Sequence, residues 1–333
     1  MADLSIHSEV PGIWSFNYQM GPSAYGHAMA RSQSLLGNIT ISNSTFSDHV
    51  SSIRVCIGEK WQNIMRNESP NSRLLKLHQA VSLMFSMFQG LTRPLAMSWY
   101  TPTRLYKYIS SLIAWQLQPS REMYTRLHPR FRPTALQVSE SYPSIIDWCP
   151  FAAVRDQLIL THAANPRLDE VMLDLSHSYC VEADLSTLVG TVPHPSPGYI
   201  CIWDLIQAMG DTNIAPADNF NPEYPGFQLP APTPAALFMS PDHARLVFRL
   251  LRIVDDGLTV FKLDPTFFDK YPELYSPALA DVMASGMPLK PPPEALLHHA
   301  RLPPPPTRME LGTLTLYRHL ADWVLNVVCD APW

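Results

Sequence analysis

The chain has 333 residues, of which 46% are hydrophobic and only 16% are charged, and its net charge is −5. The charged fraction lies well below the roughly 25% of a typical globular protein, so the chain can bury a large core. The acidic balance differs from that of nucleic-acid-binding proteins, which carry a basic surface. We therefore expect no nucleic-acid partner.

The sequence predicts a soluble protein of the cytoplasm. Its first residues, Met-Ala-Asp-Leu-Ser, have neither the basic start nor the apolar run of a secretory signal. No apolar stretch reaches the ~18 residues that a membrane-spanning helix requires. The five cysteines are odd in number and match no disulfide or zinc spacing, so we expect most of them to be buried and reduced.

Residues 1–45 predict an irregular N-terminal arm, because glycine, proline and serine separate its aromatic residues. From residue 46 to residue 333, the periodicity of the apolar residues predicts a single all-α domain of eight to ten helices. The 33 prolines, about twice the usual share, form crossings between them. The expected helices cover residues 48–66, 73–89, 101–117, 150–160, 167–182, 199–209, 240–256, 265–271, 277–285 and 308–328.

Two of these helices have clear apolar stripes. The helix at 73–89 has Ser72 as its predicted cap and Gly90 as its predicted end. Its main stripe consists of Leu74, Leu77, Val81, Met84 and Phe88. The apolar face of the last helix consists of Leu314, Tyr317, Leu320, Ala321, Val324 and Val328. Between the helices, residues 212–236 predict a long proline-rich loop, and residues 258–263 predict either a short strand or an extended connector.

The stretch from Phe131 to Leu160 is an apolar segment that contains Pro133, Pro143 and Pro150. Proline fixes φ and keeps the residue before it out of the helical region. We therefore expect an extended strap that ends in one helix. Asp147 is predicted to cap that helix, and Pro150 to lie in its first turn.

One motif runs through this stretch: Arg132-Pro133-Thr134, Leu136-Gln137, and then Pro143, Ile146-Asp147, Pro150-Phe151, Arg155-Asp156 and Leu158-Ile159. It resembles the signature of a fungal family of unknown function, most often found behind a basic leucine zipper in transcription factors. A weaker match, from Leu263 to Tyr271, is similar to the C-terminal motif of that family, so the resemblance covers about residues 70–285. Tyr142 departs from the pattern, which has a histidine before the proline.

The leucine zipper itself is not seen in this sequence. Residues 1–50 hold one basic side chain, Arg31, and no lysine, whereas a basic region that contacts DNA needs many. The resemblance therefore implies a stand-alone member of the family. A norbornene-forming Diels–Alderase is one biosynthetic protein to which such a member would be similar, although no residue of this chain is matched to one.

The sequence contains no motif that would hold a cofactor or a metal. It has no G-x-G-x-x-G loop, no H-E-x-x-H and no G-x-S-x-G, and it has only 13 glycines. Asp255-Asp256 matches half of the acidic box of metal-dependent terpene cyclases, but Gly257, Leu258 and Thr259 follow in place of further carboxylates. We expect no cofactor and no metal, and we interpret the aspartate pair as the end of a helix.

Aromatic and methionine side chains remain as candidates for a site. His177 and Tyr179 are the catalytic candidates, and Asp174 lies three residues before His177 on the same helical face. The residues predicted to line an apolar, substrate-binding pocket are Met84, Met87, Tyr108, Trp115, Trp148 and Trp203. The alternative is that most of these side chains simply pack in the core.

Two functions fit this pattern. The first is a cofactor-independent cyclase of fungal secondary metabolism, which folds an apolar polyene or terpenoid in an aromatic-lined pocket for an intramolecular Diels–Alder cyclisation. Such a pericyclase, of the isomerase or lyase class, has to orient diene and dienophile and needs no nucleophile. The alternative is a non-catalytic metabolite-sensing or dimerisation domain derived from a basic leucine-zipper transcription factor, with a homodimer as an assembly to test.

Overall fold

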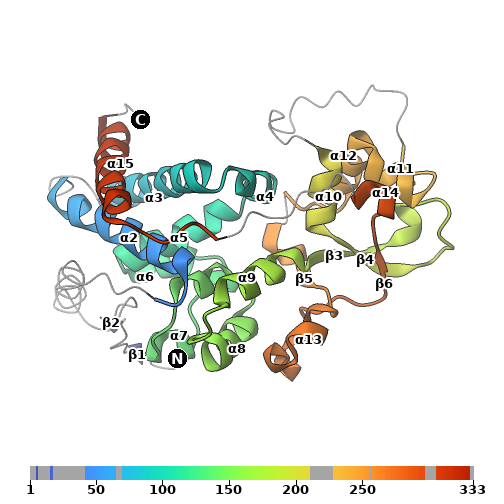
Figure 1. The fold of residues 1–333 in the computed structure, drawn as a ribbon, viewed down its shortest axis with the longest axis horizontal. Coiled ribbons are helices and arrows are strands. Elements are labelled where there is room, and N and C mark those ends of the chain that lie inside the picture. Colours follow the sequence, from blue (N-terminus) through green and yellow to red (C-terminus); the bar gives the residue numbers. More distant parts are fainter. Residues whose placement is uncertain are drawn as a thin grey trace. The chain divides into compact units, whose positions relative to one another are not determined.

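The structure, a computed structural model, describes residues 5–6, 16–17, 42–64, 70–210, 228–254, 257–296 and 305–330. Within those residues the chain forms fourteen α-helices, so the prediction of a mainly helical fold is confirmed (Figure 1). The prediction of a purely all-α fold is wrong, because four strands form a mixed sheet. Most of the predicted arm at 1–45 lies outside the described residues, which include a two-stranded ladder of β1 Ser5–Ile6 and β2 Phe16–Asn17.

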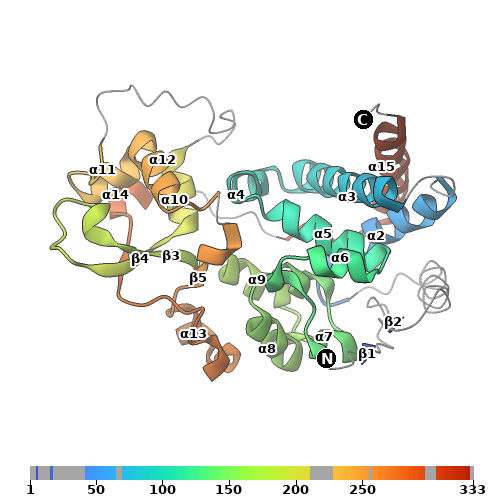
Figure 2. The same ribbon diagram turned by 180° about the vertical axis from the view of Figure 1, so that it is seen from behind.

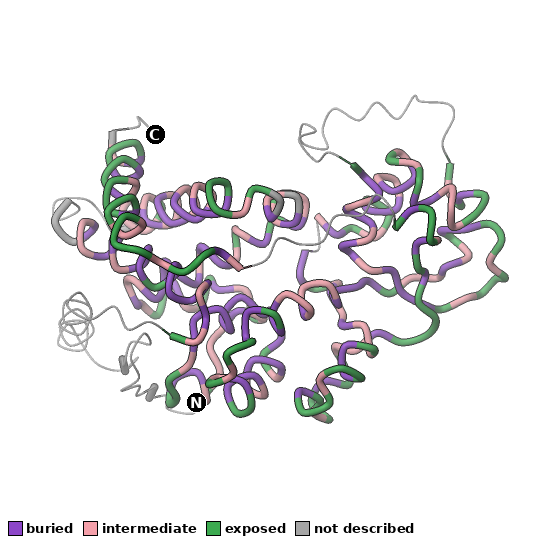
Figure 3. Tube along the Cα trace, in the orientation of Figure 1, coloured by how far each residue is buried: buried purple, intermediate pink, exposed green. Residues whose placement is uncertain are grey.

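The chain divides into two compact units. Unit 1 comprises residues 1–93, 106–172 and 304–333, and unit 2 comprises residues 94–105 and 173–303. Figure 3 shows buried residues along the described elements of each unit, so each has a core of its own. The single domain predicted for residues 46–333 stays a prediction.

Unit 1 is built around three long helices, α2 Thr45–Ile64, α3 Pro70–Thr92 and α15 Leu311–Asp330. α15 packs against both α2 and α3. The fully buried members of the predicted α3 stripe are Leu77, Val81, Met84 and Phe88. The buried members of the predicted α15 stripe are Tyr317, Ala321, Val324 and Val328. Both stripes therefore face the core, as their spacing predicted.

The remaining elements of unit 1 are α5 Leu105–Leu117, α6 Arg121–Arg126, η3 Pro129–Phe131, α7 Ala135–Ser139, η4 Ser144–Trp148 and α8 Ala152–His162. α9 Leu168–His177 begins in unit 1 and ends in unit 2. α3 extends beyond both predicted ends, so Ser72 and Gly90 lie inside it. The helix predicted for 101–117 is broken at Arg104, whose φ of 53° is left-handed, and α4 Met97–Thr103 precedes the break.

The stretch from Phe131 to Leu160 is more helical than predicted. Thr134 caps α7 through a capping box. The Oγ1 of Thr134 accepts from the N–H of Gln137, and the Oε1 of Gln137 accepts from the N–H of Thr134. The predictions for Asp147 and Pro150 are wrong. Asp147 lies buried inside η4, where other side chains bind its carboxylate, and α8 begins two residues after Pro150.

Unit 2 contains the mixed sheet, in the order β5 Lys262–Leu263, β3 Tyr179–Asp184, β4 Pro197–Cys201 and β6 Met287–Leu289. β3 pairs antiparallel with β4 and with β5, and β4 pairs parallel with β6. The helices predicted to include residues 179–182 and 199–201 are therefore wrong at those residues. Aromatic and β-branched side chains at Tyr179, Val181 and Tyr199 suit a pleated sheet once partner strands are present.

The other helices of unit 2 are α10 Ile202–Met209, α11 Pro234–Met239, α12 Pro241–Leu250, α13 Phe267–Lys270 and α14 Pro293–Leu296. α12 is shorter than predicted, and Asp255 and Asp256 lie outside the described residues. Of the predicted loop at 212–236, residues up to 227 also lie outside them, and the last residues begin α11. Of the helix predicted for 277–285, only the 3₁₀ turn η9 Pro277–Leu279 forms.

Candidate functional site

The candidate residues of unit 2 meet where α9 ends and β3 begins. The N–H of Ser178 donates to the carbonyl oxygen of Asp174, which closes the last turn of α9 after His177. The carbonyl oxygen of Ser178 accepts from the N–H of Asp264, so this turn is tied to the residue after β5. Tyr179 then opens β3. The two predicted catalytic residues therefore stand on either side of a single turn residue.

Four ring side chains form a cluster around this turn, here called the α9–β3 aromatic cluster: Trp99, His177, Tyr179 and Trp203. The ring of Trp203 lies 5.9 Å from that of His177 and 6.1 Å from that of Trp99. Trp99 in turn lies 5.8 Å from Tyr179. Trp99, Tyr179 and Trp203 are buried, whereas His177 is half-buried. The structure thus brings together three of the predicted residues and adds Trp99.

Two polar side chains at the start of α10 border the cluster. Cys201 stands at the N-cap position, and its Sγ donates to the carbonyl oxygen of His177 at 3.2 Å. Burial raises the pKa of the Asp204 carboxyl to about 6, although a hydrogen bond with Cys201 and the charge of Lys290 act in the opposite direction. This carboxyl group therefore changes its protonation state near neutral pH, as a catalytic acid or base does.

Sequence reasoning missed Asp204. An aspartate in the first turn of a helix is ordinarily an exposed side chain that interacts favourably with the helix dipole. The half-burial of Asp204 depends on the elements around α10, which the spacing of residues along α10 does not reveal. Its position directly after Trp203 in an apolar segment was the one signal available.

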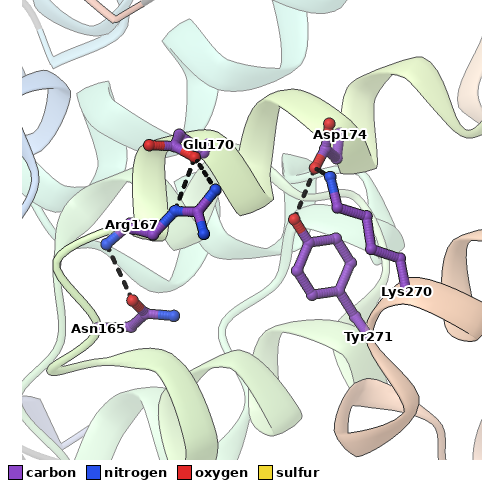
Figure 4. Close-up of polar contacts among 6 residues, drawn as sticks. All are labelled: Asn165, Arg167, Glu170, Asp174, Lys270 and Tyr271. Atoms are coloured by element: carbon purple, nitrogen blue, oxygen red, sulfur yellow. Dashed lines mark hydrogen bonds and ion pairs between the residues drawn. The ribbon is translucent and has the colours of Figure 1, made fainter.

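The side chain of Asp174 contacts the end of α13, and both residues that it binds there belong to unit 2. Its Oδ2 accepts from the Nζ of Lys270 at 2.5 Å and from the hydroxyl of Tyr271 at 2.6 Å (Figure 4). Burial alone would raise the pKa of Asp174, but these two hydrogen bonds and the neighbouring charges of Lys270 and His177 lower it below its ordinary value. Asp174 is thus ionised and holds the end of α13 through these two hydrogen bonds. The prediction that Asp174 orients the ring of His177 stays a prediction.

The other five predicted lining residues lie in unit 1: Met84, Met87, Tyr108, Trp115 and Trp148. The ring of Trp148 lies edge-on to Phe46 at 4.8 Å and to Phe85 at 5.8 Å, an arrangement typical of a packed core. Met84, Trp115 and Trp148 are buried, whereas Met87 and Tyr108 are half-buried. These residues contribute to the packing of unit 1, and their role in binding a substrate stays a prediction.

The motif that suggested a family forms a buried polar network in unit 1. Arg155 donates from Nε to the Oε1 of Gln137 at 2.8 Å. Its Nη1 donates to the carbonyl oxygens of Arg130 and Cys149, and its Nη2 donates to that of Arg132. One side chain of α8 thereby binds three carbonyl oxygens from two backbone segments, at residues 130–132 and at Cys149, which is a structural role.

Asp147 and Tyr142 extend this network. The carboxylate of Asp147 accepts from the Nε2 atoms of Gln116 and Gln137, at 2.8 and 2.7 Å, and from the hydroxyl of Tyr142 at 2.8 Å. Burial and the charge of Asp147 raise the pKa of Tyr142, so its hydroxyl remains a donor. The tyrosine that departs from the family pattern therefore still supplies a hydrogen bond to the buried aspartate.

Metal and membrane signals are missing from the part of the chain that the structure describes. No group of three or more His, Cys, Asp or Glu side chains there is placed to hold a metal ion. No helix in the same residues is both long enough and apolar enough to cross a membrane.

Comparison with known proteins gives one match. No curated protein and no solved structure matches this chain. Residues 110–187 match the model of a family described as a domain of unknown function (DUF3425). That range holds the network around Arg155 together with His177 and Tyr179, but it is less than a quarter of the chain and leaves Leu263–Tyr271 outside. Over residues 110–187 the chain is thus similar to the DUF3425 family, which supports the family resemblance drawn from its motif.

Proposed function

We propose that this chain is a cofactor-independent cyclase of fungal secondary metabolism, which folds an apolar polyene or terpenoid for an intramolecular Diels–Alder cyclisation. The observation that carries the proposal is the meeting of His177, Tyr179 and Trp203 with Trp99, and the link from this cluster through Cys201 to the carboxyl group of Asp204. Apolar rings with a few polar groups among them are the usual composition of a small-molecule site.

The chemistry of this reaction suits such a site. In an intramolecular [4+2] addition two σ bonds form, three π bonds become one, and no group leaves. Because diene and dienophile already belong to one molecule, the protein has to restrict the internal rotations that would keep the reacting ends apart, and this orientation lowers the barrier. Aromatic faces from several elements can hold an extended polyene in the reactive conformation, which is the contribution that we assign to Trp99 and Trp203.

We add Asp204 to His177 and Tyr179 as a third candidate hydrogen-bond donor. Below its pKa of about 6 the carboxyl group is protonated and can donate a hydrogen bond. A carbonyl oxygen on the dienophile gains negative charge as the reaction proceeds, so a donor aimed at that oxygen stabilises the transition state more than the substrate. We therefore expect a substrate whose dienophile is activated by an aldehyde or a ketone.

The test uses the purified chain with linear polyenes that carry such a carbonyl group, in the presence of EDTA and without added cofactor. We expect a faster cyclisation and a single stereochemical outcome. Trp203→Leu should return both towards the uncatalysed values. Trp61→Leu, a matched change at a buried tryptophan of α2 in unit 1, should leave them unchanged. An unaltered rate and stereochemical ratio with every substrate, or equal effects of the two variants, would refute the proposal.

One observation in unit 1 favours the second function, a metabolite-sensing or dimerisation domain derived from a basic leucine-zipper protein. On α15, Leu316, Trp323 and Val327 have exposed fractions of 45%, 50% and 42%. With the half-buried Leu320 they follow the four-three-four spacing of a helix-pairing seam. This function predicts a homodimer that Trp323→Glu dissociates. A monomeric mass from light scattering at every concentration would exclude dimerisation through α15.

A further inference from the structure

One segment of this chain has a large excess of basic over acidic residues. Residues 73–132 hold nine lysines and arginines against one acidic residue, Glu122, whereas the other residues hold fifteen basic and twenty-eight acidic side chains. The net charge of −5, from which we expected no nucleic-acid partner, conceals this separation. Attraction of a polyanion depends on charge gathered on one surface, so the segment needs separate consideration.

Five of these cations belong to consecutive elements of unit 1. They are Lys107 on α5, Arg121 and Arg126 on α6, Arg130 in η3 and Arg132 just after it, here called the α5–η3 basic surface. Figures 1 and 2 both show α5 and α6 side by side. The rings of Trp115 and Tyr124, which lie 5.7 Å apart, join the two helices.

Aromatic contacts hold the η3 end of this surface in place. The ring of His128, directly before η3, lies 5.0 Å from that of Tyr108 on α5. The guanidinium of Arg132 lies over the ring of Tyr124 on α6, with Cζ 5.6 Å from its centre. Burial lowers the pKa of His128 most, and the positive charges of Arg130 and Arg132 lower it further. Both guanidinium groups therefore lie near the His128 ring.

The charge of this surface is only partly neutralised by its own elements. Glu122 is the acidic residue in the segment, and it pairs with Arg126 at 2.6 Å. Lys107, Arg121 and Arg126 are exposed, whereas Arg130 and Arg132 are half-buried. Three cations therefore reach solvent directly, and Arg132 contacts α6 beside Arg126, where its Nη2 donates to the carbonyl oxygen of Thr125.

We propose that the α5–η3 basic surface binds the phosphate backbone of a nucleic acid. Four of its five cations are arginines, whose planar guanidinium groups bind phosphate through two hydrogen bonds at once. The half-buried rings of Tyr108, Tyr124 and His128 lie among them, and cations interleaved with aromatic rings are typical of nucleic-acid-binding surfaces.

A lipid surface fits these residues less well. Binding at a membrane interface uses large apolar side chains that enter the bilayer beside the cations. Among the described side chains from residue 105 to residue 134, no large apolar one is exposed. This proposal concerns unit 1 and does not rest on the cyclase activity proposed for unit 2.

The experiment measures the binding of the full chain to fluorescent duplex DNA and to single-stranded RNA of one length, by anisotropy, between about 50 and 200 mM salt. We expect a dissociation constant that rises steeply with salt. The double variant Arg121→Gln with Arg126→Gln should weaken binding about tenfold at low salt and reduce the salt slope by about two.

Arg167→Gln is the matched control, because Arg167 is an exposed arginine of unit 1 that pairs with Glu170 on α9 (Figure 4). It should bind as the unaltered chain does. Absence of binding at low salt, or equal effects of the double variant and the control, would overturn the proposal. Binding only to vesicles that contain phosphatidylserine, or only to polyglutamate, would overturn it in favour of a lipid or an acidic protein.

Discussion

Arg155 and Gln137 lie 18 residues apart and are joined by a hydrogen bond of 2.8 Å from Nε to Oε1. Both side chains are buried, with exposed fractions of 1% and 2%. Gln137 also donates to Asp147 and caps α7 together with Thr134, so a single amide serves the guanidinium, the carboxylate and a helix end. These polar contacts therefore hold together the segment between α6 and α8, which lies in the range matched by the family model.

Removal of Arg155 should strongly destabilise unit 1. Arg155→Ala leaves three backbone carbonyl oxygens and the Oε1 of Gln137 without this donor, and an opened buried network of this kind costs on the order of 3–5 kcal/mol. Urea denaturation followed by circular dichroism measures the loss. Arg167→Ala, on the surface of the same unit, should change the free energy of unfolding by less than about 0.5 kcal/mol. Equal midpoints for the two variants would contradict a central role for Arg155.

Two glycines should respond in opposite ways to alanine. At Gly198 in β4 an added Cβ would lie 2.2 Å from the carbonyl oxygen of Met287 in β6, so backbone would have to move. We expect Gly198→Ala to cost about 1–3 kcal/mol, as overpacking does. At Gly90 nothing lies within 4 Å of an added Cβ, and the site is inside α3, so Gly90→Ala should stabilise by about 0.5–1 kcal/mol. If Gly198→Ala raised the thermal midpoint as Gly90→Ala does, the backbones of β4 and β6 would lie farther apart at Gly198 than the structure describes.

His49 connects α2 to the C-terminal segment of unit 1. Its ring nitrogens lie 2.5 Å from the hydroxyl of Tyr317 and 2.7 Å from the carbonyl oxygen of Thr307. Because a carbonyl oxygen only accepts, Nε2 donates to Thr307 and Nδ1 accepts from Tyr317, which is the neutral ring. Burial lowers the pKa of His49 below 6.5, against weaker opposing effects of Thr307, Asp48 and Asp169.

The stability of the chain should therefore depend on pH through His49. Between the lowered pKa and 6.5 the unfolded chain binds more protons than the folded chain. The contribution of His49 is then complete above pH 6.5 and is lost as the pH falls through that window. Asp204, whose pKa is raised, contributes the opposite slope, so the test is a comparison: with rising pH near 6 the thermal midpoint should rise less, or fall more, in His49→Gln than in the unaltered chain. His319→Gln, at an exposed position of α15, should keep the full pH slope, and an unchanged slope in His49→Gln would remove His49 from the explanation.

If the protonated carboxyl group of Asp204 donates the hydrogen bond that activates the dienophile, the rate of the proposed cyclisation should follow the protonated form of Asp204. The pKa of about 6 predicts a plateau at lower pH and a decline as the pH rises through 6. Asp204→Asn retains a donor that does not titrate, so its rate should be lower but independent of pH. Rate measurements across that range on both proteins provide the check. A native profile that stays flat, with the same rate as Asp204→Asn, would assign the donor to another residue.

Local signals predicted well the elements that carry their own periodicity. The stripe of α3 and the apolar face of α15 could be read from the sequence because each helical turn repeats within about four residues. The motif from Arg132 to Ile159 likewise lies in the range that matches the DUF3425 family. It did not predict that Asp147 and Arg155 would both bind Gln137 in a buried network. Its polar side chains are spread over 28 residues and find one another only in the folded chain.

The sequence by itself determined that this chain is mainly helical, where its long apolar stripes lie and which stretch resembles a known family, because those signals lie within a few turns of the backbone. The tertiary structure alone decided that residues 179–184 form a strand, since their backbone groups are paired by β4 and β5, up to 84 residues away. It also decided that Trp99 and Trp203 meet His177 and Tyr179, and that burial shifts the pKa of Asp204. Strand pairing and desolvation depend on partners distant along the chain, and residue spacing within one element carries no information about them.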